Sequence, residues 1–196
     1  MAGDGIKWNM TAKVIKYEPE TVERLTNQFG HEPTGYHLRH LESIGLLVPD
    51  DIVDVPGNLL TTVGLNRITN LIIGGGGTPL AHADAVVGVG NSTTTAVIGD
   101  TALGADGTAN AYYQQADSGS PTQSNGTINI TCTYQSGNAN FAWQEWGWAV
   151  ASGTITAGTT LASVGTSPVL LNHKIQSLGT KSSGAIWSLA ATLTLS

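Results

Sequence analysis

Two segments of this chain alternate strictly between apolar and polar residues, and this pattern constrains the fold more than any other feature. The apolar positions of residues 127–134 are Ile128, Ile130, Cys132 and Tyr134. Those of residues 187–195 are Trp187, Leu189, Ala191, Leu193 and Leu195. A period of two places each set on one face of a β-strand, where Cys132 becomes a small buried core residue. With glycine- and serine-rich stretches between the strands, the sequence predicts a mainly β fold, an antiparallel β-sandwich or jelly roll.

The composition narrows the classes of partner. The net charge of −6 argues against nonspecific binding to nucleic acid and gives no support to an anionic membrane surface. No apolar run approaches the roughly 20 residues of a membrane-spanning helix. The single cysteine excludes an intrachain disulfide and a cysteine-rich zinc site. The first residues lack the apolar core of a secretory signal, so we expect synthesis in a cytoplasm and neither nucleic acid nor membrane as partner.

Charged residues are distributed unevenly along the chain. Residues 1–54 carry five of the eight Lys and Arg residues and nine of the fourteen Asp and Glu residues. We therefore expect an N-terminal extension of residues 1–56, with a short strand at 11–17 and two short helices near 19–30 and 35–47, followed by a β-sandwich domain of residues 57–196. Two adjacent helices also suggest a DNA-binding helix-turn-helix, which the acidic charge of the segment disfavours. His37 and His40 could share a metal ion, but exposed helix surface is the favoured interpretation.

One longer helix is predicted at the start of the second segment. Asn58 is a suitable N-cap, and Gly74 is a natural C-terminal stop. Helical spacing relates the apolar residues Leu60, Val63, Ile68, Leu71 and Ile72. We expect this helix to cap the sandwich. The glycines of residues 74–77 follow a helix instead of preceding one, and they lack the Lys-Ser/Thr ending of a phosphate-binding loop, so they predict a flexible exit.

The sequence contains no pattern of catalytic or metal-binding residues. In residues 57–196 the acids and histidines are Asp84, Asp100, Asp106, Asp117, Glu145, His82 and His173. No two of them stand at a motif spacing, and no serine lies in a nucleophile elbow. A glycosidase built on Glu145 would need a second carboxylate that the sequence does not suggest. We therefore expect no enzyme, no cofactor and no metal.

Three of the five tryptophans, Trp143, Trp146 and Trp148, lie within six residues around Glu145. On a strand, Trp146 and Trp148 would project to one side, and Trp143 and Glu145 to the other. Aromatic residues on both sides predict a strand buried on both faces, by the second sheet and by the capping helix or a neighbouring subunit. A buried Glu145 would need hydrogen-bond donors such as backbone amides or Arg67.

These residues, together with Trp187, are the candidates for structural or assembly roles. The alternative is that Trp143, Trp146 or Trp148 forms an exposed platform on which a sugar stacks.

Four stretches, taken in order, resemble a family of small virion proteins of tailed bacteriophages, especially those of actinobacterial hosts. They are GNLLTTVGLNRITNLIIGGG, VGVGNSTTTAVIGDTALGA, NFAWQEWGWAVA and LLNHKIQSLGTKSSGAIWSLAATLTLS. The resemblance covers about residues 55–196. His173 stands where an Arg is common in the family, and residues 21–47 have no counterpart.

The resemblance implies a component of the phage particle, assembled in the host cytoplasm. We expect a noncatalytic capsid decoration or minor capsid protein that binds the major capsid protein. The alternatives are a tail or baseplate protein that binds other tail proteins, and a host-surface carbohydrate-binding module. Few charges protect the exposed strand edges of such a sandwich, so we also expect a homo-oligomer, with a trimer favoured by the symmetry of capsid sites.

Overall fold

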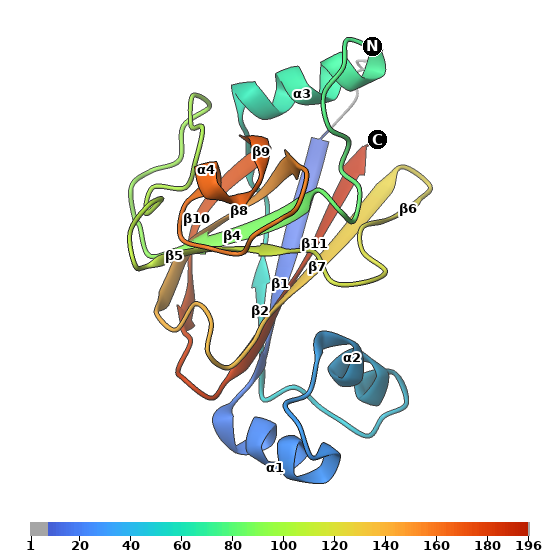
Figure 1. The fold of residues 1–196 in the computed structure, drawn as a ribbon, viewed down its shortest axis with the longest axis vertical. Helices are drawn as coiled ribbons and strands as arrows, with labels where there is room; N and C mark the ends of the chain where they lie inside the picture. Colours follow the sequence, from blue (N-terminus) through green and yellow to red (C-terminus); the bar gives the residue numbers. More distant parts are fainter. Residues whose placement is uncertain (1–7, 196) are drawn as a thin grey trace, which may run out of the picture.

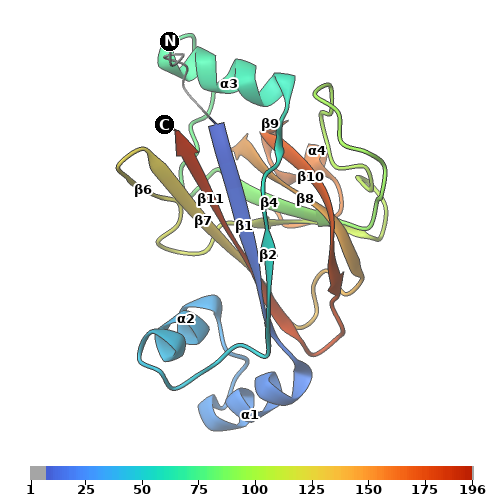
Figure 2. The ribbon, with the colours of Figure 1, turned by 180° about the vertical axis from the view of Figure 1, so that it is seen from behind.

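The computed structural model describes residues 8–195 and consists mainly of two antiparallel β-sheets (Figure 1). Strands account for 40% of the chain and helices for 19%, which confirms the expected mainly β class. The two helices α1 and α2 lie at one end of the molecule and α3 lies at the other, as both views show (Figures 1 and 2).

The first sheet has five strands in the order β2-β1-β11-β7-β6. Their bounds are Trp8–Tyr17 for β1, Asp51–Val55 for β2, Thr122–Ser124 for β6, Thr127–Tyr134 for β7 and Ile186–Leu195 for β11. Both segments that alternate strictly in sequence are therefore neighbouring strands, paired along their length from Trp187 opposite Tyr134 to Thr194 opposite Thr127.

The second sheet has the order β3-β10-β8-β4-β5, and β9 also pairs with β8. Its strands are Leu59–Leu60 for β3, Ala85–Gly90 for β4, Ala111–Gln115 for β5, Ala142–Ser152 for β8, Thr166–Leu170 for β9 and Asn172–Thr180 for β10. Leu171 alone separates β9 from β10, and the central strand of the sheet is β8.

The N-terminal strand is an integral part of the first sheet. β1 pairs with β11 over ten positions, from Trp8 opposite Leu195 to Tyr17 opposite Ile186, and with β2 on its other side. Its side chains Met10, Ala12 and Val14 are buried in the main core. Residues 1–56 were expected as an extension of the sandwich. Of the described residues in that range, β1 and β2 belong to the first sheet, and the segment between them projects from it. Charge counts did not reveal this because β1 carries two lysines, Lys13 on its exposed face and Lys16, which is buried and paired with Asp51.

The two expected N-terminal helices are present as α1, Pro19–Phe29, and α2, Gly35–Ser43. Gly30 ends α1 in the left-handed conformation, with φ of 75°. The helices have a small core of their own that includes Val22, Leu25 and Leu38, and Ile186 of β11 joins it. The segment is therefore tied to the sheet by packing.

The helix expected from residue 58 is α3, Thr62–Ile72, and it begins later than predicted. Its N-cap is Thr61, whose side chain accepts the N–H of Gly64 at 2.9 Å, and not Asn58. Residues 59 and 60 form β3 with β10 instead, which delays the helix. Its apolar residues do not all face the protein, since Leu71 and Ile72 are 37% and 77% exposed.

The space between the sheets is filled by one large apolar cluster to which both sheets contribute. Cys132 lies in it, fully buried, and confirms the predicted inner face of β7. A second cluster covers the outer side of the second sheet, where Leu103, Leu161 and Val164 pack against Ala149 and Ala151 of β8. Leu161–Val164 is the short helix α4.

Candidate functional site

The side chain of Glu145, on β8, is fully buried and is surrounded by hydrogen-bond donors. Its Oε1 accepts the backbone N–H of Ala105 at 2.8 Å and of Ser92 at 3.3 Å, and its Oε2 accepts that of Gly104 at 2.8 Å. Backbone amides were the expected donors, and they come from the long connection between β4 and β5. A buried carboxylate is stable only with such partners.

His173, on β10, supplies the fourth donor. Its Nε2 donates to Oε2 of Glu145 at 2.8 Å, and its Nδ1 lies 2.6 Å from Oδ2 of Asp100. Both neighbours are carboxylates, so the form of the ring with a proton on each nitrogen is the one that this arrangement stabilises. Burial by itself lowers the pKa of His173, but the hydrogen bonds to Glu145 and Asp100 outweigh it, so that the pKa is raised.

This buried network fastens the connection of residues 91–110 to the second sheet. Asp100 also accepts the N–H of Val97 at 2.8 Å, which shapes the connection locally. Two glycines leave the space that the network needs, because a Cβ at Gly90 would collide with Oε1 of Glu145, and a Cβ at Gly104 would lie 2.5 Å from Oγ of Ser92. Gly90 and Gly104 are therefore required by close packing.

The network is poorly suited to acid–base catalysis. Glu145 is 0% exposed and His173 is 3% exposed, so a substrate cannot reach either group. Both ring nitrogens of His173 are already bonded to carboxylates, which leaves no free nitrogen to accept a proton. The arrangement is that of a buried ion pair that holds two sheet strands and a loop together.

All three tryptophans of β8 are fully buried and belong to the main core. Trp143 was expected on the side opposite Trp146 and Trp148, but it packs in the same cluster. The expected simple alternation fails where the pairing of β8 with β10 shifts register, between Ile175 and Gly179. The outer face of β8 is covered by the chain's own loops and α4, whereas the capping helix or a neighbouring subunit was expected there.

Trp143 and Trp187 meet edge to face between the two sheets, with ring centroids 5.0 Å apart. Tyr134 packs on Trp143 in the same manner at 4.7 Å. On the far side, Nζ of Lys16 lies 4.6 Å from the centroid of the Trp187 ring. Trp187 is therefore a structural residue of the core, which agrees with the role expected from the sequence.

Arg67 is not a partner of Glu145. It lies on α3, at the end of the sandwich, and its guanidinium donates to the carbonyl of Thr78 at 3.1 Å. Arg67 was expected as the donor because residues 57–196 contain few Lys and Arg residues. His173 is the charged donor to Glu145 instead. The only indication of this in the sequence was that a buried Glu145 needs a charged donor.

Residues 8–195 contain no group of three or more His, Cys, Asp or Glu side chains that could hold a metal ion. His37 takes part in the N-terminal cap of α2, where its Nδ1 accepts the N–H of Thr34 at 3.2 Å. His40 is exposed and stacks on Tyr36 with ring centroids 6.1 Å apart. Within the same described range, no helix is both long enough and apolar enough to cross a membrane.

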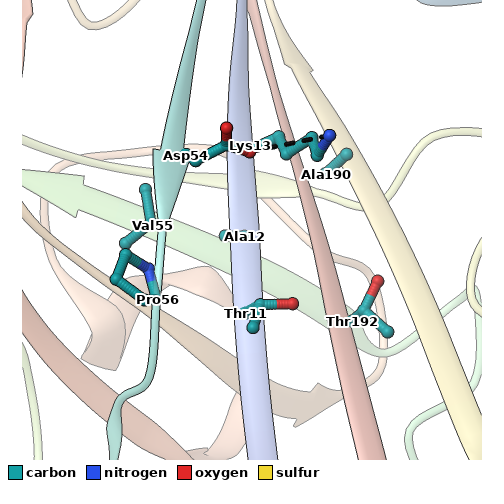
Figure 3. A pocket seen from close by; sticks show the side chains of 8 residues that line it. All are labelled: Thr11, Ala12, Lys13, Asp54, Val55, Pro56, Ala190 and Thr192. Atoms are coloured by element: carbon teal, nitrogen blue, oxygen red, sulfur yellow. Dashed lines mark ion pairs between the residues drawn. The ribbon is translucent and has the colours of Figure 1, made fainter.

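A shallow hollow of about 410 Å³ lies on the outer face of the first sheet. Figure 3 shows its lining side chains on β1, β2 and β11, with Thr11, Thr192 and Ala190 beside the ion pair of Lys13 and Asp54. The two charged atoms are 3.6 Å apart and well exposed, so the pair contributes little to stability. The hollow contains no buried polar group and is ordinary solvated sheet surface.

No protein-family model, curated protein or solved structure matches this chain.

Proposed function

We propose that this chain is a noncatalytic structural protein of a tailed-phage virion, which binds the major capsid protein of the head as a decoration or minor capsid protein. One observation carries the proposal. Three of the four stretches that resemble phage virion proteins meet at the buried network, to which they contribute Asp100, Glu145 and His173. Carboxylates and histidines are common in active sites, but here Asp100, Glu145 and His173 hold two strands and a connection together.

The first of the four stretches joins the same region through a separate contact. Oγ1 of Thr61 donates to the carbonyl of Leu170 at 2.6 Å, which places the start of α3 against the end of β9. The resemblance therefore concerns segments that are in contact with one another, as is expected when a shared sequence pattern specifies a shared scaffold.

The buried tryptophans weigh against the carbohydrate-binding alternative. Trp143, Trp146 and Trp148 are each 0% exposed, so none of them offers a ring face on which a sugar could stack. A glycan-binding role would have to use other residues. The tail or baseplate alternative has the same scaffold requirements and differs from our proposal only in the partner.

The decisive experiment is to locate the protein in particles of the phage that encodes it. Purified virions are disrupted, heads and tails are separated on a density gradient, and the protein is quantified in each by mass spectrometry. Our proposal predicts many copies per head and none in isolated tails. Recovery with tails would support the tail alternative, and absence from virions would refute both.

A further inference from the structure

Lys181, directly after β10, is almost fully buried, with 1% of its surface exposed. Lysines are rarely buried to this extent unless they are paired with a carboxylate. Within residues 8–195, no Asp or Glu oxygen lies within ion-pair distance of this amine, whereas Lys16 has Asp51 at 2.8 Å. The buried amine therefore needs an explanation other than an ion pair.

The two groups that do meet Nζ of Lys181 are oxygens of amides. One is the backbone carbonyl of Gln135 at 2.9 Å, and the other is Oδ1 of the Asn140 side chain at 2.7 Å. Burial lowers the pKa of Lys181 to about 8, despite the opposing effect of Glu32. An appreciable fraction of this lysine is consequently neutral, and hence nucleophilic, at mildly alkaline pH.

The side chain of Asn140 is held in place by several contacts. Its Nδ2 donates to the carbonyl of Ser136 at 2.9 Å, which directs Oδ1 toward the lysine. The preceding residue, Ala139, has a positive φ of 54°, and its carbonyl accepts the indole N–H of Trp143 at 2.9 Å. The backbone N–H of Lys181 donates to the carbonyl of Phe141 at 3.1 Å. The two main chains are thus tied together beside the reacting side chains.

The distance between the two groups is short enough for reaction. Since a C=O bond is about 1.2 Å long, Nζ lies within about 4 Å of Cγ of Asn140, against about 3–3.5 Å in a near-attack geometry. Holding an amine and an amide in this way replaces a bimolecular encounter by an intramolecular one, which can raise the effective concentration by many orders of magnitude.

We propose that Lys181 and Asn140 react with each other to form an intramolecular isopeptide bond. Neutral Nζ attacks Cγ of Asn140, the new C–N bond forms, and the bond from Cγ to Nδ2 breaks. One proton of Nζ passes to the departing nitrogen, which leaves as ammonia into the solvent beside the exposed Asn140. The reaction changes no oxidation state and needs no other reactant.

The bond would join residues 41 positions apart in the sequence and fasten the loop between β7 and β8 to the end of β10. Such a cross-link restricts the unfolded chain in the way a disulfide does, but it does not depend on an oxidising compartment. The inference concerns this chain alone and does not rest on the proposed virion role.

The test is the intact mass of the full-length protein after incubation at pH 9. We expect a mass below that of the sequence by one ammonia molecule, at a rate that rises with pH through about 8. Chymotryptic digestion should yield a fragment that joins the residues around 140 to those around 181. Lys181→Arg and Asn140→Ala should each abolish the loss, whereas the control variants Lys174→Arg and Asn138→Ala should retain it.

An unchanged mass at pH 9 for the folded wild-type protein would overturn the proposal. A loss of ammonia without the joined fragment would also overturn it, because cyclisation of an asparagine with its own backbone gives the same mass change. Circular dichroism of each variant shows that the variants are folded. If Asn140→Ala unfolds the protein, Asn140→Leu serves as a second variant that lacks the electrophile.

Discussion

Glu145 and His173 form an ion pair between neighbouring strands of the second sheet, with Oε2 and Nε2 2.8 Å apart and both side chains buried. Asp100 on the opposite side of the ring adds a second acceptor at 2.6 Å. Because two carboxylates face one imidazole, the positive form of His173 is the stabilised one, and the connection of residues 91–110 depends on it.

The first prediction is that this pair makes stability depend on pH. The folded pKa of His173 is raised, so its contribution is fully present below the unfolded pKa of about 6.5 and is lost as the pH rises through the folded value. The free energy of unfolding should be measured in urea for wild type and for His173→Gln, whose side chain cannot become charged. The advantage of wild type over the variant should decrease as the pH rises above about 6.5. Parallel pH profiles for the two proteins would contradict the ion pair.

His173→Arg provides a matched control. The guanidinium of an Arg stays charged throughout the accessible pH range. This variant should keep the connection of residues 91–110 in place and lose the pH dependence. Its amide hydrogen exchange at residues 100–105 should match that of wild type at pH 6, whereas His173→Gln should exchange faster there.

The alternation of β7 and β11 predicted the first sheet well because, over most of their length, one face of each strand is more buried than the other. β8 was harder to interpret, since it is buried on both faces and its pairing with β10 shifts register, so the alternation placed Trp143 on the wrong side. The role of β1 was missed for a different reason. Pairing between residues about 180 positions apart, such as Trp8 with Leu195, leaves no local signal in a single sequence.

The candidate site was predicted only in part. The sequence indicated that Glu145 would be buried and would need donors, because it lies among aromatic residues. It could not identify His173 and Asp100, which are 28 and 45 positions away in the chain and are brought together only by the pairing of β10 with β8 and by the fold of the connection. Arg67 was wrongly expected to donate to Glu145, because the sequence does not show where the helix that carries Arg67 packs against the sheets.

The second prediction concerns Glu145. Glu145→Leu leaves three backbone N–H groups and Nε2 of His173 without an acceptor, so it should lower the free energy of unfolding by about 3–5 kcal/mol. Glu145→Gln keeps one acceptor oxygen and the shape of the side chain, and its cost should be smaller. Chemical denaturation of the three proteins at pH 6 measures the difference. Equal stabilities would show that the carboxylate is not buried as described.

The third prediction separates a core tryptophan from a sugar platform. Trp146→Ala should cost about 3–5 kcal/mol, the usual cost of truncating a buried aromatic residue. Tyr36→Ala, at a side chain that is 68% exposed, should cost far less and serves as the control. Titration of wild type with soluble host-wall glycan should produce no saturable change in tryptophan fluorescence. A folded, stable Trp146→Ala protein that had lost glycan binding would refute the core assignment.

The fourth prediction concerns Cys132. Its thiol is 0% exposed, and burial raises its pKa well above the usual value, so the reactive thiolate is scarce in the folded protein. Labelling with a thiol reagent should be slow in native buffer and rapid in denaturant. Fast labelling of the native protein would place Cys132 outside the core and would put the inner face of β7 in doubt.

The final prediction concerns assembly and the projecting segment of α1 and α2. Removing residues 1–54 is not a clean test, because β1 pairs with β11 and its loss would expose the middle of the first sheet. Replacing residues 19–49 by a short flexible linker keeps both β1 and β2.

We expect the wild-type protein to be a homo-oligomer, most simply a trimer, by light scattering at micromolar concentration. If the sandwich makes the subunit contacts, the shortened protein should have the same number of subunits as the wild type. If α1 and α2 contact the particle, the shortened protein should bind at lower occupancy to particles that lack the native protein. A monomeric wild-type protein would refute the proposed oligomer, and full occupancy by the shortened protein would exclude α1 and α2 from the particle contact.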